Sequence, residues 1–353
     1  MPDFNFVGAA YVAASITQDD QDLVNWYPEV DQTKREGERG VVALYPTPGL
    51  TKLLQLDTVG PVRAFRVLPG GLTLLAVCGN ILYSITRAYT PTAVGTLLTS
   101  TGPVSITDNG VSAYLCDGNN RYYYTWGTAT FSVVSDGAFN GANTVDVVDN
   151  FMVYNNPMSN QFGCTDVGAV TSNGLNFASL LAAPGNLVGL ICDHRQIYLL
   201  GEYASEVWTD IGSFPFPFGI VSGASMQHGC AANGSIARLG ESFAFLAQDT
   251  RGQAIVVQMN GYAPVRISTF ALEAAMARYS VISDAIAWTY QQAGHEFYML
   301  TFPSADATWC YDLATQLWHR RAWRDSRNVY HRHRGNCSAV FGGQVIVGDF
   351  ETG

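Results

Sequence analysis

Charged residues are scarce in this chain of 353 residues, because Asp, Glu, Lys and Arg together make up only 14% of it. A freely soluble protein carries about a quarter of its residues as charges, so the composition favours a protein whose surfaces are buried in an assembly. The net charge of −10 makes the whole molecule a poor general binder of nucleic acid, since phosphate contacts need clustered Lys and Arg. An acidic wall would still suit DNA that has to slide past it.

Signals for export, membrane insertion and disulfide formation are missing as well. The N-terminus has no basic region typical of a signal peptide, and no apolar stretch approaches the ~18 residues of a membrane helix. The cysteines are odd in number, scattered and never in a CxxC pair; they are Cys78, Cys116, Cys164, Cys192, Cys230, Cys310 and Cys337. Since most lie in apolar runs, we expect reduced, buried thiols in a protein that folds in a reducing cytoplasm.

Helical periodicity is almost absent, and a different pattern recurs. The best helix candidate is 269–279, with Thr269 as N-cap and Glu273 near the first turn. The recurring unit is a short strand, a Gly/Asn/Asp turn and a second strand, which is the chemistry of β-hairpins. Its copies are 73–85, 111–125, 145–154, 187–200, 236–259, 285–301 and 338–350. They begin roughly 35–50 residues apart, the spacing of propeller blades.

This spacing predicts an all-β fold, a β-propeller-like array of about six or seven blades built from antiparallel hairpins with very little helix. A pair of β-sandwiches is the alternative. Residues 1–50 carry acidic and polar runs, so we expect an N-terminal arm and first strands that contact a neighbour, followed by a propeller body over 51–353. The last hairpin has no returning strand, and an exposed edge is a liability, so we expect the body to be truncated in its last blade.

Two ordered sets of residues resemble a known family, the packaged-DNA stabilisation proteins of short-tailed phages (podoviruses), also called tail hub or nozzle proteins. The first set is Gly8-Ala9-Ala10-Tyr11, Ser15, Asn25-Trp26-Tyr27-Pro28-Glu29 and Pro46-Thr47-Pro48-Gly49-Leu50. The second set is Glu206-Val207-Trp208, Gly212, Pro217-Phe218, Gly229-Cys230-Ala231-Ala232, Ser235-Ile236-Ala237, Phe245-Leu246-Ala247-Gln248-Asp249, Gly252, Val256-Val257, Gly261 and Arg266-Ile267-Ser268-Thr269. The resemblance covers most of residues 8–350.

The resemblance implies a structural protein of the virion tail, with no catalysis and no cofactor. It implies a homo-oligomeric ring of six copies below the portal and adaptor proteins, assembled in the host cytoplasm, which extends the DNA exit channel and retains packaged DNA until ejection. It further implies contacts with tailspikes or fibres and with a plug or needle, while double-stranded DNA passes through without sequence specificity. The arm would then contact a neighbour or the adaptor. Family members continue beyond a motif like Gly348-Asp349-Phe350, which agrees with the expected truncation.

The largest charge anomaly is the basic segment 319–334, which holds six Arg and three His in an acidic chain. Contact with DNA phosphates, an interface with a neighbouring subunit or partner, and a solvated loop are the three interpretations. The interface is favoured, because Trp318, Trp323 and Tyr330 are interleaved with the arginines, and Arg, Trp and Tyr dominate interface hot spots. The candidate contact residues are Arg320, Arg321, Trp323, Arg324, Arg327, Arg332 and Arg334.

A second candidate is the aromatic and proline loop, in which Phe214, Phe216 and Phe218 alternate with prolines. Proline cannot continue a central strand, so we expect a polyproline-like loop that packs its aromatics between blades or offers them to a partner.

Signals for metal binding and catalysis are weak. His331 and His333 could place two imidazoles on one side of a strand as metal ligands, but no Cys or carboxylate cluster stands at fixed spacing nearby, and no metal is expected. There is no GxSxG, HExxH, P-loop or Rossmann pattern. The alternatives to a structural tail protein are a carbohydrate-active propeller hydrolase, whose site would be assembled from distant loops, and a non-phage β-propeller interaction scaffold.

Overall fold

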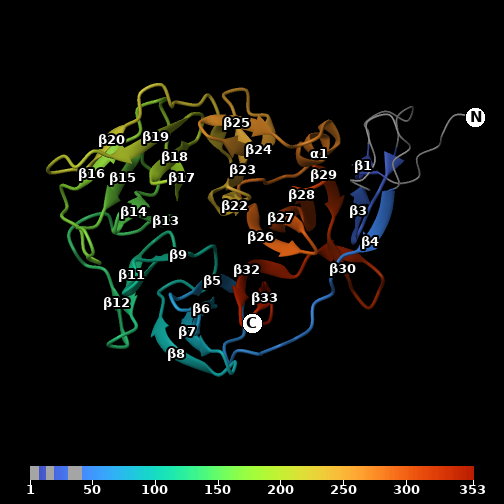
Figure 1. Cartoon of the computed structure of the whole chain (residues 1–353), viewed down its shortest axis with the longest axis horizontal. Helices are drawn as coiled ribbons and strands as arrows, with labels where there is room; N and C mark the ends of the chain where they lie inside the picture. The colour runs from blue at the N-terminus through green and yellow to red at the C-terminus, as the bar shows by residue number, and fades with distance from the viewer. Residues whose placement is uncertain (1–7, 13–19, 31–41) are drawn as a thin grey trace, which may run out of the picture.

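The protein is a six-blade β-propeller. The computed structural model describes residues 8–12, 20–30 and 42–353, and these residues form many short antiparallel strands and one α-helix. Six sheets stand around a central axis, and within each sheet the strands follow one another outward (Figure 1). The predicted all-β propeller with very little helix is therefore confirmed, and so is the predicted range of blade numbers.

Blades 1 to 3 are four-stranded sheets whose hydrogen-bonded order follows the chain. Blade 1 is β5 (Val62–Val67), β6 (Thr73–Cys78), β7 (Ile81–Thr86) and β8 (Pro91–Thr96). Blade 2 is β9 (Ser105–Asp108), β10 (Ser112–Cys116), β11 (Arg121–Thr125) and β12 (Thr130–Val133). Blade 3 is β13 (Val145–Val148), β14 (Phe151–Asn155), β15 (Gln161–Cys164) and β16 (Phe177–Ser179).

Blades 4 to 6 continue the ring. Blade 4 is β17 (Leu187–Asp193), β18 (Gln196–Gly201), β19 (Ser205–Asp210) and β20 (Phe218–Ile220). Blade 5 is β21 (Gly229–Cys230), β22 (Ala237–Leu239), β23 (Ser242–Gln248), β24 (Ala254–Asn260) and β25 (Ala263–Arg266), where β21 and β22 both pair with β23. Blade 6 is β26 (Ile286–Gln292), β27 (His295–Phe302), β28 (Ala307–Asp312) and β29 (Leu317–Arg320).

A hairpin closes the ring between blades 6 and 1. It consists of β32 (Gly335–Phe341) and β33 (Gln344–Asp349), and β32 lies against the inner strands β5 and β26. Asn336 Nδ2 donates to Val62 O of blade 1 at 3.1 Å, and Ser338 Oγ donates to Thr289 O of blade 6 at 2.8 Å. These two strands form a sheet of their own. It stays a prediction that further strands would add to this hairpin and complete a blade.

The core lies between the blades, because each blade is covered on both faces by its neighbours. All five residues of β10 are buried, and Val77 and Leu115 belong to one apolar cluster that joins blades 1 and 2. A strand covered on both faces loses the polar–apolar alternation of a half-exposed strand. This explains why apolar runs, and not alternation, dominate the inner part of the sequence.

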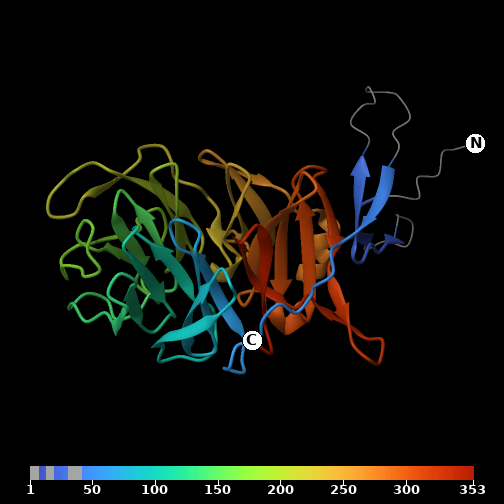
Figure 2. The same cartoon turned by 60° about the horizontal axis from the view of Figure 1, so that its bottom comes forward.

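The N-terminal segment adds to the outer edge of blade 6. It contains the hairpin of β3 (Trp26–Val30) and β4 (Val42–Pro46), with β1 (Tyr11–Val12) and β2 (Asp20–Gln21) beside it. Asn25 fixes the segment, since its side chain donates to Ala322 O at 2.8 Å and accepts from Ala322 N at 3.0 Å. The chain then crosses the molecule to reach blade 1 (Figure 2).

The one α-helix of the described residues, α1 (Phe270–Met276), lies beside blades 5 and 6. Thr269 Oγ1 accepts from Leu272 N at 3.3 Å, so the predicted helix and its N-cap are confirmed. Glu273 turns inward, where Arg266 donates to both of its oxygens at 2.7 and 2.6 Å and Ser268 Oγ donates at 2.6 Å. The sequence motif 266–269 thus holds the helix in place. Within the described ranges no helix has the length and apolarity to cross a membrane.

Candidate functional site

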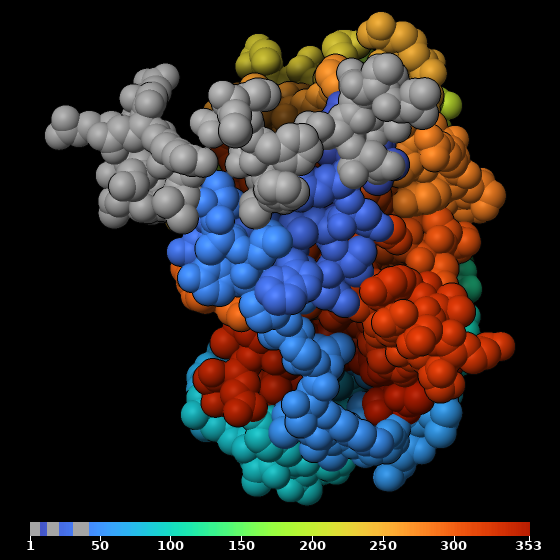
Figure 3. Space-filling view, turned by 90° about the vertical axis from the view of Figure 1, so that its right-hand side faces the viewer, coloured from blue at the N-terminus to red at the C-terminus, as the bar shows by residue number. Residues whose placement is uncertain are grey.

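The basic segment 319–334 forms a projection from blade 6. After β29 it continues as the hairpin of β30 (Ala322–Arg324) and β31 (Tyr330–Arg332), which extends away from the propeller next to the N-terminal segment (Figure 3). Asp325 shapes the tip, because its Oδ1 accepts from the backbone N of Arg327 and Val329 at 2.9 and 2.8 Å. Asx turns of this kind are a local property of Asp in tight turns.

Three arginines of this segment pair with carboxylates of the chain, and a fourth is buried. Arg320 pairs with Asp22 at 3.1 Å, and Arg334 pairs with Asp349 at 2.5 Å and with Glu351 at 3.0 Å. Arg321 is only 3% exposed. Arg324 and Arg327 lie on the surface, where Arg327 contacts Asp325 at 3.4 Å, a kind of exposed pair that stabilises little. The surface of the segment that a partner can reach is therefore centred on Arg324 and Arg327.

Aromatic rings and cations alternate along the same projection. Trp323 has the Arg334 guanidinium 5.1 Å from its ring centre and the His331 ring 5.2 Å away. Arg332 lies 3.7 Å from the ring centre of Phe350, and Arg324 lies 5.2 Å from that of Tyr330. Such contacts between cations and rings contribute about 0.5–1 kcal/mol each at exposed sites. These contacts stiffen the hairpin. The Tyr330 side chain nevertheless stays half exposed to solvent.

His331 and His333 lie in different environments, although only one residue separates them. His331 Nδ1 is 2.7 Å from Asp306, and this hydrogen bond raises the pKa of His331. His333 is buried, and burial, with the charge of Arg321, lowers its pKa to about 3. No group of three or more His, Cys, Asp or Glu suited to a metal occurs among the residues that the structure describes.

The aromatic and proline loop divides between the two predicted roles. Phe216 and Phe218 pack inward, with ring centres 5.5 Å from Phe162 and 5.4 Å from Phe151 respectively, so they fill the space between blades 3 and 4. Phe214 is 97% exposed. Of the three aromatics, Phe214 is therefore the one that a partner can contact.

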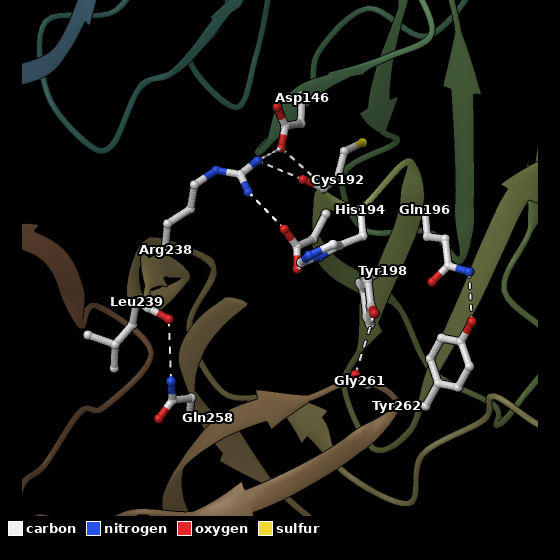
Figure 4. Close-up of polar contacts among 11 residues, drawn as sticks. Asp146, Cys192, His194, Gln196, Tyr198, Arg238, Leu239, Gln258, Gly261 and Tyr262 are labelled. Carbon is white, nitrogen blue, oxygen red and sulfur yellow. Dashed lines mark hydrogen bonds and ion pairs between the residues drawn. The ribbon is translucent and has the colours of Figure 1, made fainter. Parts of the chain in front are cut away.

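A network of ion pairs near the axis joins the inner strands of three blades (Figure 4). Arg238 of blade 5 contacts Asp146 of blade 3 at 3.2 Å and Asp193 of blade 4 at 3.3 Å, and it donates to Cys192 O at 2.6 Å. Burial raises the pKa of Asp146, although the charge of Arg238 opposes this shift. Arg66 and Asp108 form a similar link between blades 1 and 2 at 2.6 Å. No sequence pattern pointed to these residues, because their partners lie on other blades, far away along the chain.

An open groove of about 620 Å³ lies beside this network, between blades 4 and 5 (Figure 4). Its polar wall contains Asp193, His194, Glu241 and Gln258. Gln196 Nε2 donates to the Tyr262 hydroxyl at 2.7 Å and so ties the two blades together across the groove. Asp193 is already occupied by Arg238 and by His194 Nδ1, 2.9 Å away. The groove thus lies where side chains hydrogen-bond blade 4 to blade 5.

The seven cysteines are free thiols, and six of them are buried while Cys337 is partly so. Burial raises the pKa of the Cys78 thiol to about 11 and that of Cys164 to about 12. Because the thiolate is the reactive form, these groups behave as small apolar side chains, and the expected buried state is confirmed.

The family model described as bacteriophage P22 Gp10, β-propeller, matches residues 13–353 of the chain. No curated protein matches this chain. Among solved structures, the extracellular domain of BT4673 from B. thetaiotaomicron is similar at a TM-score of 0.54 and 10% identity, over 84% of this chain and 38% of that chain. The N-terminal domain of Nup159 matches at a TM-score of 0.47 and 9% identity, over 82% of this chain and 86% of that chain. The chain spans well under half the length of the BT4673 extracellular domain, and this likeness shows the propeller fold alone.

Proposed function

Because the chain belongs to the phage stabilisation family whose model is described as bacteriophage P22 Gp10, β-propeller, we propose that it is a hub or nozzle subunit of a phage tail. In this proposal identical copies, six as the resemblance implies, form a ring below the portal and adaptor. The ring extends the exit channel and retains packaged double-stranded DNA until ejection. The family match over residues 13–353 is the observation that carries the proposal.

A closed ring of identical subunits needs two different surfaces that fit each other, one on each side of the subunit. Exposed apolar side chains gather on one side, on the outer strands of blades 3 and 4 and the turns that precede them: Leu175, Phe177, Ile211, Phe214 and Ile220. We call these five residues the apolar edge. Low overall charge and exposed aromatics are what such a subunit contact requires.

The opposite side of the propeller carries the β30–β31 projection and the N-terminal segment (Figures 1 and 2). Here Trp26 and Tyr45 of the β3–β4 hairpin are each about half exposed, and so is Tyr330 of the projection, which also carries the surface arginines Arg324 and Arg327. We call these five residues the basic edge. Each subunit would then place its basic edge on the apolar edge of the next one. Two carboxylates accompany that edge, because Asp210 directly precedes Ile211 and Asp166 accepts from Asn176, which lies between Leu175 and Phe177. This assigns the candidate segment to a subunit contact, with the arm of residues 1–50 reaching a neighbour or the adaptor.

DNA that must leave quickly requires a channel that does not bind it. The net charge of −10 suits such a wall, since DNA adheres to clustered Lys and Arg. Retention then comes from the added length of the exit path and from the plug or needle that it holds. We assign no catalytic step to the chain.

The first test is the mass of the purified protein in solution, which should show a ring of copies, or ring formation when the portal and adaptor proteins are added. Particles assembled without the chain should package DNA and then lose it, as measured by DNase accessibility. A chain that stays monomeric with those partners, together with normal DNA retention in its absence, contradicts the proposal.

The second test addresses the two edges separately from the family assignment. The double variant Arg324→Glu with Arg327→Glu, and the single variant Phe214→Ser, should each weaken ring formation while the folded chain keeps its thermal stability. Arg251→Glu and Leu72→Ser are matched controls, because both residues are well exposed and lie outside the two edges. Rings that form equally well in all four variants would remove the edges from the proposal and leave DNA retention untouched.

A further inference from the structure

A second, smaller cavity of about 210 Å³ lies between blade 6 and the β32–β33 hairpin. Its walls come from β26, from β33, from the segment 48–50 and from the basic segment. Its apolar lining residues include Leu50, Trp288, Val345 and Val347. None of its lining residues belongs to the two edges, although the segment 48–50 follows β4 and Arg321 precedes β30, which both carry residues of the basic edge. Of the residues that resemble the family, Pro48-Gly49-Leu50 line the cavity.

Arg321 lines this cavity and is 3% exposed. Its Nη1 donates to the Tyr290 hydroxyl at 2.6 Å and its Nη2 to Pro48 O at 3.4 Å. Its Nε is buried without a hydrogen-bond partner among the described residues. A guanidinium has five N–H donors, so most donors of Arg321 are unused. Its two acceptors, the Tyr290 hydroxyl and Pro48 O, are neutral oxygens.

No negative charge balances this buried cation within the described part of the chain. The cavity wall contains no Asp or Glu, and among the described residues Arg321 forms no ion pair, in contrast to Arg320, Arg327 and Arg334 of the same segment. The two buried histidines next to Arg321 are neutral at physiological pH, because burial, with the Arg321 charge, lowers the pKa of His319 and of His333 to about 3. Gly335 N donates to His333 Nδ1 at 3.0 Å, which fits the neutral ring.

A buried charge without a partner is strongly unfavourable, and arginine cannot lose its proton at physiological pH. An anion in the adjacent cavity removes this cost. The planar fork of a guanidinium matches a carboxylate in two parallel hydrogen bonds, whereas one arginine balances only half the charge of a doubly charged phosphate. The aromatic and aliphatic walls fit an apolar body next to the charge.

We propose that this cavity binds a carboxylate with a small apolar body, held by Arg321 against Trp288 and Tyr290. The carboxylate belongs either to a free organic acid or to the side chain of a glutamate in a polypeptide. Both sources offer the same group to Arg321, and the following experiment distinguishes them.

The test titrates the purified chain with sodium benzoate at constant ionic strength, with chloride replaced step by step. Benzoate should raise the thermal unfolding midpoint to a plateau and change the tryptophan fluorescence, while benzamide, its neutral analogue, should do neither. Arg321→Met should abolish the response and should itself unfold no earlier than the parent, because an apolar side chain replaces an unpaired buried charge. An equal response to benzamide, or an undiminished benzoate response in Arg321→Met, overturns the proposal.

A second pair of variants keeps Arg321 and decides the matter if Arg321→Met does not fold. Val345→Phe fills the cavity from β33, whereas Val340→Phe places the same ring on β32, outside the cavity wall. The benzoate response should be lost only in Val345→Phe, and equal responses in the two variants contradict the proposal.

N-acetyl-glutamate amide is the second probe, and it distinguishes the two sources of the carboxylate. A response to benzoate alone identifies a free acid as the ligand class. An equal or stronger response to the blocked glutamate identifies a polypeptide side chain.

Discussion

Breaking the buried ion pair between Arg121 and Asp136 should cost the fold several kcal/mol, and Asp136→Asn tests this. Arg121 Nη2 lies 2.7 Å from Asp136 Oδ1, and the two side chains are 1% and 4% exposed. Asp136 also accepts from the backbone N of Ser172 at 2.8 Å and of Ala138 at 3.1 Å. Arg121 stands over the Tyr154 ring at 4.4 Å. Asparagine keeps the shape of the carboxylate and removes its charge.

The size of the effect follows from what remains after the change. Removing one partner of a buried pair leaves the other charge uncompensated, which costs about 3–5 kcal/mol. The asparagine amide also has one oxygen where the carboxylate has two, so one buried N–H donor loses its acceptor, at about 1–3 kcal/mol within the same total. We therefore expect Asp136→Asn to lose about 3–5 kcal/mol of unfolding free energy.

The loss should depend on pH in a defined direction. Burial alone would raise the pKa of Asp136, but the hydrogen bond and charge of Arg121, together with the backbone hydrogen bonds from Ser172 and Ala138, outweigh it, and the pKa is lowered. A carboxyl whose folded pKa lies below its unfolded value of about 3.9 stabilises the fold above that value, and the stabilisation is lost as pH falls through the folded pKa. The gap between parent and variant should thus be constant near neutral pH and narrow only in acid below about pH 4.

The assay is urea unfolding at pH 7, followed by intrinsic fluorescence, with Asp149→Asn as the matched control. Asp149 pairs with Arg195 at 2.8 Å, but Arg195 is 81% exposed, so the control should lose less than about 1 kcal/mol. Adding Arg121→Met to Asp136→Asn should recover part of the loss, because the stranded charge is removed. A loss of under about 1 kcal/mol in Asp136→Asn, or no recovery in the double variant, would refute the reasoning.

Two further predictions concern backbone packing and the thiols. A Cβ at Gly229 would lie 2.2 Å from the backbone C and O of Glu202, so Gly229→Ala should lower the thermal midpoint sharply or prevent folding. Gly127→Ala, where no atom lies within 4 Å, should leave the midpoint nearly unchanged, and equal midpoints in the two variants would contradict this packing. The native chain should react with less than one equivalent of Ellman's reagent at pH 8 and with seven after denaturation, since burial raises the pKa of thiols such as Cys78; rapid native labelling would count against it.

Local signals in the sequence were enough to identify the fold. Turn chemistry is set by neighbouring residues, so the hairpin predicted at 145–154 appears as β13–β14 and the one at 187–200 as β17–β18. The hairpins at 73–85 and 111–125 appear as β6–β7 and β10–β11, the middle pairs of their blades. Which pair stands innermost depends on the neighbouring blades, and the hairpin pattern alone contains no information about it.

Only the tertiary structure decided which charges are free. The sequence marked 319–334 as a basic anomaly, but its neighbouring arginines have different surroundings. Arg320, at the end of β29, reaches Asp22, 298 residues away, while the next residue, Arg321, is buried. Arg238 likewise meets Asp146 across 92 residues. The composition and the turns determined an all-β propeller with few charges, because those signals act over a few residues. The role of each charge depends on its burial and on its partner, and the fold sets both over long distances.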